Sequence, residues 1–207
     1  MINCNCPEIK IVNCVKYLGL NIDSHLSWDH HIFELHKKIR PLNLLFYNLK
    51  KFMSTQSMIP IYYAFYQSRL QYGLCFWGSA GISKINKIII SQKFAVRMIG
   101  HQPVLAHTSE IFKTLNFFPV QILCKKLVLK FFINNILNDV NTVRARNTRL
   151  AATSMVTLPD YRKTRSRDSL LYKGCYFFNE FVRKHPQYHN NPNKEFNNYI
   201  SFLLFNY

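Results

Sequence analysis

Between residues 29 and 49, apolar residues recur at alternating steps of three and four positions. This spacing predicts an α-helix with one apolar face, because a helix turns once in about 3.6 residues. The apolar face comprises Ile32, Leu35, Ile39, Leu42, Phe46 and Leu49. Off this face lie Lys37, Lys38, Arg40, Lys50 and Lys51. Pro41 has no amide hydrogen and costs about 3 kcal/mol inside a helix, so we expect a kink or break near residues 38–41.

Residues 8–23, ahead of this helix, carry closely spaced apolar side chains interrupted by Asn13 and Gly19. The pattern predicts one or two short strands, with a close approach of the backbone at Gly19. Asp23 and Ser24 then supply residue types that favour turns. We therefore expect a short strand or hairpin that leads through a turn into the first helix.

Further helices are predicted downstream from caps, glycines and apolar periodicity. A second helix is expected from Thr55 or Ser57 to Gly73, with Pro60 tolerated in its first turn and its tyrosines packed in the core or at an interface. A third is expected after Gly81 and ends at Gly100. Residues 107–117 open with a capping signature and predict a short helix, and residues 120–139 predict another of about five turns.

From residue 141 onward the chain becomes basic and less apolar. We interpret residues 141–169 as a mostly irregular linker with a short extended piece at 155–159, followed by helices at 170–184 and 194–205. The predicted fold is mainly α: a short N-terminal β-hairpin in 1–25, a helical bundle in 26–140, and a basic linker with two helices in 141–207.

The charge balance is strongly basic. Lys and Arg number 27 against 10 Asp and Glu, which gives a formal net charge of +17. This excess favours a polyanionic partner, nucleic acid first and an acidic membrane surface second, against the alternative of a solvated basic surface with no specific partner.

The cysteines argue for a reduced, intracellular setting, in the nucleus or the cytoplasm. The six are widely scattered, without the dense spacing of a secreted disulfide framework. Cys4, Cys6, Cys14 and His25 match no zinc spacing, so no metal site is expected. The longest apolar runs are shorter than the roughly 20 residues that span a bilayer, so no membrane span is expected.

Enzymatic motifs are weak. His30, His31 and His36 do not have the spacing of a metalloprotease helix, and no glycine-rich phosphate loop is present. A cysteine nucleophile stays open, although nothing points to one of the six. We expect no cofactor and no small-molecule substrate.

A series of short segments nevertheless resembles a known family. In order they read YLGLNID, LSWDHHI, SRLQYGLCFWG, ISQKFAVRMIG, TLNFFPVQ, NTR, LPDYRKTRSRDSLLYKGCYFFNE and EFNNYISFLL. Together they are similar to the region after the catalytic palm in reverse transcriptases of non-LTR retrotransposons, of the jockey and tick-transposon type. The resemblance extends over residues 15–207.

This resemblance implies a primer-grip-like hairpin at Tyr17, Leu18 and Gly19, and a thumb-like helical bundle that lies against template and primer. It implies a nucleic-acid partner, whether RNA, RNA/DNA hybrid or DNA duplex, held by basic side chains that contact phosphates. The candidate contact residues are Lys37, Lys38, Lys50, Lys51, Lys84, Lys87, Lys93, Arg97, Arg162, Lys163, Arg165 and Arg167.

The sequence departs from the family at the catalytic carboxylates. The family places an Asp pair upstream of the LG segment, where it holds two metal ions, but this chain has no Asp-Asp pair. Asp23 and Asp29 are interpreted as turn and helix-cap groups. We therefore expect a truncated RNA-directed DNA polymerase that is not an enzyme as an isolated chain, since the Mg²⁺ would belong to the missing palm.

Two alternatives remain at this stage. One is a basic helical interaction or membrane-surface protein without nucleic-acid function. The other is a degraded transposon remnant that has lost the palm surface on which it packed, in which case residues 1–25 would be marginally stable.

Overall fold

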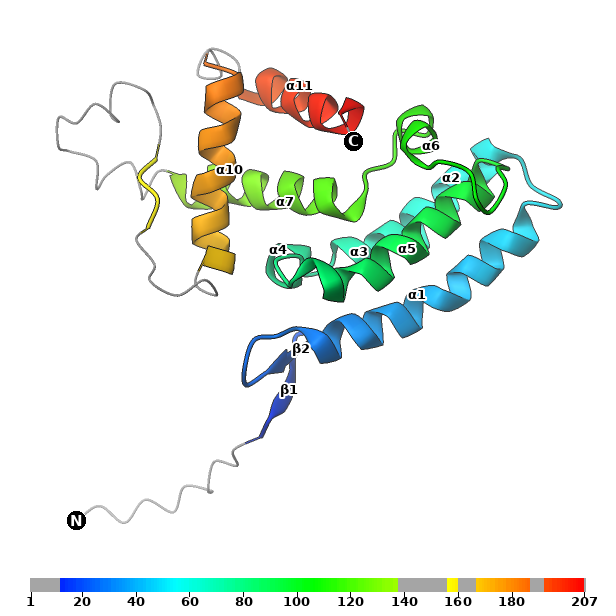
Figure 1. Ribbon diagram of the computed structural model, residues 1–207, viewed down its shortest axis with the longest axis horizontal. Coiled ribbons are helices and arrows are strands. Elements are labelled where there is room, and N and C mark those ends of the chain that lie inside the picture. The colour runs from blue at the N-terminus through cyan, green and yellow to red at the C-terminus, as the bar shows by residue number, and fades with distance from the viewer. Residues whose placement is uncertain (1–11, 138–155, 160–166, 187–191, 207) are drawn as a thin grey trace.

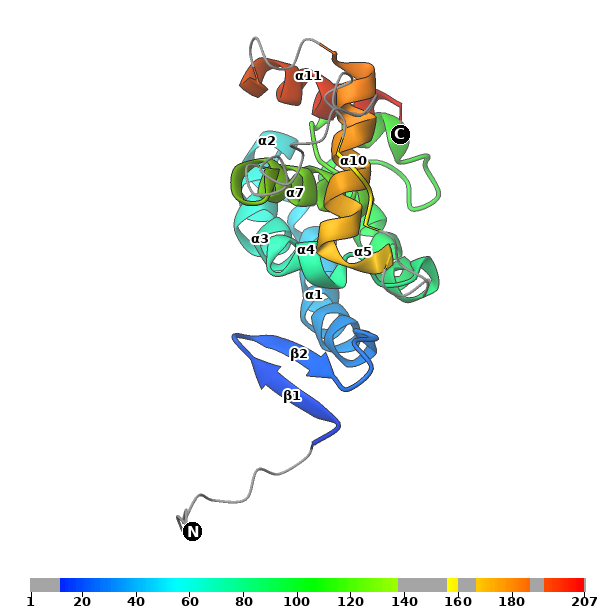
Figure 2. The same ribbon diagram turned by 90° about the vertical axis from the view of Figure 1, so that its left-hand side faces the viewer.

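The computed structural model describes residues 12–137, 156–159, 167–186 and 192–206. Within these ranges the chain is mainly helical, with a two-stranded antiparallel hairpin ahead of the helices (Figure 1). The hairpin projects from the end of the helical body at which the first helix begins (Figure 2). The predicted mainly α fold class with an N-terminal hairpin is confirmed.

The hairpin pairs β1 (Cys14–Tyr17) with β2 (Leu20–Asp23). In its register Tyr17 lies opposite Leu20, so only Leu18 and Gly19 form the turn. Both turn residues have positive φ, 45° at Leu18 and 79° at Gly19. Such two-residue turns match the twist of the flanking strands, and the second position suits glycine.

Helix α1 (Asp29–Leu49) buries the predicted apolar face, with Ile39 and Phe46 fully inaccessible. The break expected near Pro41 is absent, because the helix is continuous through that residue. Pro41 cannot donate to the carbonyl of Lys37, one turn earlier. The neighbouring Lys38 carbonyl, at the same point of the helix, accepts a 3.0 Å hydrogen bond from the Arg69 guanidinium.

The second predicted helix is present but not uniform. It consists of α2 (Thr55–Ile61), the π-helical segment η1 (Tyr62–Gln67) and α3 (Ser68–Gln71). The Ser54 hydroxyl caps it by accepting from the Ser57 amide. The π-helical turns, which the sequence pattern did not predict, carry Tyr62 and Tyr66 into the core, where both are fully buried.

After the short α4 (Leu74–Trp77), helix α5 (Ile82–Ile99) lies side by side with α1. The predicted boundaries of α5 are confirmed, with Gly81 and Gly100 as caps. Figure 1 shows α1 and α5 as the long parallel elements of the lower part of the molecule. Between them, the Asn43 amide donates a 2.8 Å hydrogen bond to the Ser91 hydroxyl.

Helices α6 (Ser109–Thr114) and α7 (Val120–Asn135) follow, as predicted. The two C-terminal helices, α10 (Leu170–Lys184) and α11 (Pro192–Phe205), are also confirmed, and α10 crosses α7 steeply (Figure 1). Residues 156–159, the described part of the extended piece predicted at 155–159, form no regular secondary structure. Both backbone hydrogen-bonding groups of Val156 instead pair with the Asn179 side chain at 2.7 Å.

Helix α7 joins two hydrophobic clusters. Leu123 and Val128 belong to the cluster built with α1 and α5, whereas Leu129 and Phe132 belong to the one built with α10 and α11. The C-terminal helices therefore pack on the helical bundle through α7. The greater part of the predicted basic linker lies outside the described residues.

Replacing Gly174 by alanine is expected to separate α7 from α10. A Cβ at this position would lie 2.5 Å from Cδ2 and 3.1 Å from Cβ of Phe132, so ring rotation alone does not relieve the clash. We expect Gly174→Ala to lower the free energy of unfolding by about 1–3 kcal/mol, measured by urea denaturation. Gly81→Ala is the comparison: the nearest atom, Ser83 Oγ, would lie 3.9 Å away, so only the exchange of glycine for alanine at the N-cap of α5 should cost stability there. A loss for Gly174→Ala that does not exceed the loss for Gly81→Ala would contradict this packing.

Candidate nucleic-acid interface

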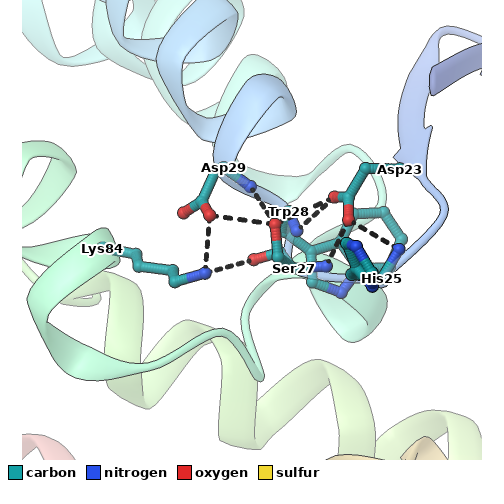
Figure 3. Close-up of polar contacts among 6 residues, drawn as sticks. All are labelled: Asp23, His25, Ser27, Trp28, Asp29 and Lys84. Carbon is teal, nitrogen blue, oxygen red and sulfur yellow. Dashed lines mark hydrogen bonds and ion pairs between the residues drawn. The ribbon is translucent and has the colours of Figure 1, made fainter. Parts of the chain in front are cut away.

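The hairpin is attached to α1 through the carboxylate of Asp23 (Figure 3). Its two oxygens accept hydrogen bonds from the backbone amides of His25, Ser27 and Trp28, at 3.1, 2.8 and 2.8 Å. The Ser27 hydroxyl adds a fourth at 3.1 Å. Trp28 and Leu26 both have positive φ in this turn, a conformation uncommon for such residues. The carboxylate therefore holds a strained turn in place.

The environment of Asp23 lowers its pKa below the usual value of 3.8. Burial alone would raise the pKa, but the hydrogen bonds from Ser27, Trp28 and His25 favour the charged carboxylate and outweigh it. The ionised form is thus the one that the folded turn stabilises. The prediction that Asp23 is a turn group is confirmed.

Lys84 of α5 fastens the same turn from the other side (Figure 3). Its ammonium lies 2.8 Å from an Asp29 carboxylate oxygen and donates at 3.1 Å to the Ser27 carbonyl. The hydrogen bond from Lys84 to the Asp29 carboxylate is the largest cause that lowers the pKa of Asp29, followed by the hydrogen bond from the Ser27 hydroxyl and the charge of Lys84. Lys84 was predicted to contact nucleic acid, but here its charge joins α5 to the start of α1.

His31 is buried beneath the hairpin, with ring centroids 6.3 Å from Trp28 and 6.0 Å from Trp77. Its Nδ1 accepts from the Asn21 amide of β2 at 3.4 Å. Burial, and then the positive charge of Lys38, lowers the pKa of His31. The imidazole is therefore neutral at pH 7 and serves the packing of the hairpin on α1.

A groove of about 430 Å³ lies between the hairpin, α1 and α3. Its rim includes the predicted Gly19 and Lys38, and adds Lys16, Arg69 and Tyr72, which sequence reasoning did not select. The remaining lining residues are Asn21, His30, His31, Glu34, Leu35 and Ser68. We call this site the hairpin groove. It brings three cationic side chains together from β1, α1 and α3.

Tyr72 fixes the turn of the hairpin against the end of α3. Its hydroxyl donates a hydrogen bond to the Leu18 carbonyl, and its ring would lie 3.3 Å from a Cβ at Gly19. Gly73 follows with φ of 62°, and its lack of a side chain leaves room for Leu20. The predicted close approach at Gly19 thus has a partner, while Tyr17 and Leu18 are exposed by 61% and 72%.

The other predicted cations of α1 do not line the hairpin groove. Lys37 is exposed on α1. Lys50 and Lys51 lie at the far end of the helix, 5.1 and 5.7 Å from the centroid of the Tyr47 ring. Burial, followed by the charges of Lys87 on α5 and Arg40 on α1, lowers the pKa of His36.

The remaining predicted contact residues are dispersed. On α5, Lys87 is exposed and Lys93 is half-buried, whereas Arg97 donates through Nε to the Ala106 carbonyl at 2.7 Å. Arg167 is exposed ahead of α10. Arg162, Lys163 and Arg165 lie outside the described residues.

Neither a metal site nor a membrane span emerges from the described residues. They contain no group of three or more His, Cys, Asp or Glu side chains placed to hold a metal ion. In the same ranges, every helix is too short or too polar to cross a bilayer. No protein-family model matches the chain, and no curated protein or solved structure matches it significantly.

Removing the Asp23 carboxylate should loosen the junction between the hairpin and α1. We expect Asp23→Ala to lower the free energy of unfolding at pH 7 by about 1–2 kcal/mol, since several turn amides lose their acceptor. The folded-state pKa of Asp23 is below 3.8, so its contribution is present above pH 3.8 and is lost as the pH falls through the folded value. The difference in the free energy of unfolding between the variant and the unmodified protein should therefore become smaller as the pH falls below 3.8.

Asp29→Ala provides the comparison for this measurement. Asp29 forms an exposed ion pair with Lys84, and such pairs contribute about 0–1 kcal/mol. Thermal or urea unfolding across a pH series separates the two carboxylates. If the loss of unfolding free energy caused by Asp23→Ala grew as the pH was lowered, the Asp23 carboxylate would not be the group that stabilises the turn.

Proposed function

We propose that this chain binds nucleic acid through the phosphate backbone, as the thumb-like region of a reverse transcriptase of the non-LTR retrotransposon type. The observation that carries the proposal is the convergence of Lys16, Lys38 and Arg69 around Gly19 in the hairpin groove. Residues with cationic side chains from three separate elements line one groove, and a residue without a side chain lines it with them. This arrangement suits a phosphate backbone, which needs positive charge and close approach of the protein main chain.

The location of the groove agrees with the family resemblance. Gly19 belongs to the segment that resembles the primer grip, and Arg69 and Tyr72 belong to the segment SRLQYGLCFWG that resembles the region after it. Residues quoted for a resemblance in sequence order are therefore neighbours in the fold, although about 50 positions separate them. The net charge of +17 supports a polyanionic partner of the same kind.

The proposal concerns binding and not polymerisation by this chain. Two-metal phosphoryl transfer needs carboxylates that hold both ions, and the sequence has no Asp-Asp pair. We therefore expect no dNTP incorporation on a primed RNA template with Mg²⁺ or Mn²⁺, tested beside a complete reverse transcriptase as the positive control. Measurable primer extension would show that other carboxylates perform this chemistry.

Binding to a short RNA/DNA hybrid should weaken steeply with salt. Each phosphate contact releases counterions, so a plot of log affinity against log salt should have a slope of several units between about 50 and 200 mM. Lys16→Gln and Lys38→Gln remove cations that line the hairpin groove, and each should reduce the slope by about one unit. Fluorescence anisotropy gives both quantities, and a flat salt dependence would contradict phosphate binding.

A membrane-surface role is the second candidate, favoured by the outer face of α1. Phe33, Leu44 and Tyr47 are exposed there by 61%, 62% and 41%, next to exposed basic residues of the same helix. Amphipathic surfaces with aromatic and basic residues can lie on anionic bilayers. Anionic liposomes in the same anisotropy assay, as competitors of the labelled hybrid, distinguish the two: the hybrid should remain bound if nucleic acid is the partner.

A further inference from the structure

The charge around the hairpin groove exceeds what a backbone phosphodiester needs. Lys16, Lys38 and Arg69 supply three positive charges, and Glu34 supplies one negative charge, which leaves a net charge of plus two. A phosphodiester carries a single negative charge, whereas a phosphomonoester carries about −1.5 to −2 at neutral pH. The net charge of plus two therefore matches one phosphomonoester, whereas a strand backbone would have to place two successive phosphodiesters in the groove to match it.

Arg69 is held in a position that leaves it able to bind an anion. One terminal nitrogen, Nη1, donates to the Lys38 carbonyl at 3.0 Å, which anchors the guanidinium beside the Lys38 side chain. A guanidinium has five N–H donors, so the others are available for the oxygens of an anion. Because Arg69 bonds to the backbone carbonyl of Lys38, this contact does not use the Lys38 ammonium, which can bind the ligand.

The rest of the lining suits a nucleotide. The groove volume of about 430 Å³ falls in the range of small-molecule sites, roughly 300–1,000 Å³, so the groove can take a single nucleotide. Tyr72 is exposed by 54% and its hydroxyl is tied to the hairpin turn, so its ring offers a fixed surface on which a base can stack. Asn21 and Glu34 add polar groups that can bind base edges or sugar hydroxyls.

We propose that the hairpin groove binds a nucleotide that carries a phosphomonoester, which in a nucleic-acid strand is a phosphorylated end, probed here with a 5′-phosphate. Lys16, Lys38 and Arg69 hold the phosphate, and Tyr72 stacks on the terminal base. This inference rests on the proposed nucleic-acid binding and adds a preference among strand ends that backbone binding alone does not create.

The test compares two single strands of identical sequence, one with a 5′-phosphate and one with a 5′-hydroxyl, by fluorescence anisotropy with the label at the 3′ end. The phosphorylated strand should bind about tenfold more tightly, as expected from additional charge-assisted hydrogen bonds. Lys38→Gln should reduce this ratio to below about threefold. Glu34→Gln, which removes the opposing negative charge, should increase affinity for the phosphorylated strand.

Lys37→Gln is the matched control. It removes the same charge from the adjacent position of α1, but Lys37 does not line the groove. It should weaken both strands equally and leave their ratio unchanged. A ratio near one for the unmodified protein, or a ratio that Lys38→Gln leaves intact, would overturn the inference while nucleic-acid binding stands. Failure to bind either single strand while the RNA/DNA hybrid still binds would also overturn the inference alone, whereas failure to bind all three would overturn the proposed function.

Free competitors separate a nucleotide site from a phosphate site. Adenosine 5′-monophosphate should displace the phosphorylated strand at a concentration about tenfold lower than inorganic phosphate, because only the nucleotide can stack on Tyr72. Tyr72→Ala should remove this difference, and Tyr72→Phe should retain it if the ring and not the hydroxyl contacts the base. Equal competition by the two compounds in the unmodified protein would refute the nucleotide assignment.

Discussion

The carboxylate of Asp23 determines how the only described sheet is attached to the helices. It accepts hydrogen bonds from three backbone amides of the turn and thereby holds Leu26 and Trp28 in positive-φ conformations. Without these bonds, the strain of the turn and the desolvated amides would favour a different path for the chain. The direction in which the chain leaves the hairpin for α1 depends on this turn, and Tyr72 and Leu20 add contacts that hold the hairpin itself against the helices.

Much of the fold could be predicted because it depends on local patterns. The apolar face of α1, the caps of α5 and the close approach of the backbone at Gly19 follow from periodicity and residue chemistry over a few positions, whereas the two-residue turn at Leu18 and Gly19 was not predicted. Continuity through Pro41 was not predictable in this way. The Lys38 carbonyl, next to the one that Pro41 leaves without a donor, accepts a hydrogen bond from Arg69. Arg69 lies 31 positions away from Lys38, so no local sequence pattern predicts that contact.

The candidate site shows the same division. Gly19 and Lys38 were selected from the sequence, whereas Lys16, Arg69 and Tyr72 enter the groove only because α3 packs behind the hairpin. A signal for Arg69 and Tyr72 was present in the segment SRLQYG, whose basic and aromatic residues precede Gly73. Reading it required the knowledge that this segment ends beside Leu18, which only the tertiary structure provides.

The net charge overstates how many cations are free to bind a ligand. Lys84 pairs with Asp29, and Arg97 is bound to the Ala106 carbonyl. Lys125 lies 2.6 Å from Glu180 in a partly buried pair. Burial acts to raise the pKa of Glu180, but Lys125 and Lys184 lower it overall. These cations stabilise contacts within the fold. On the proposed function, binding specificity therefore depends on the positions of Lys16, Lys38 and Arg69, which line the hairpin groove.

Hairpin position and ligand binding are therefore coupled. A two-stranded hairpin is marginally stable by itself, and here it is retained by the Asp23 turn, the Tyr72 contact with Leu18 and the packing of Leu20 against Gly73. A ligand that bridges Lys16 of the hairpin to Lys38 and Arg69 of the helices binds only when the hairpin is docked. On the proposed binding mode, such a ligand stabilises the docked state by RT ln(1 + L/Kd), where L is the free ligand concentration. The ligand proposed for the hairpin groove would then also hold the hairpin against the helices.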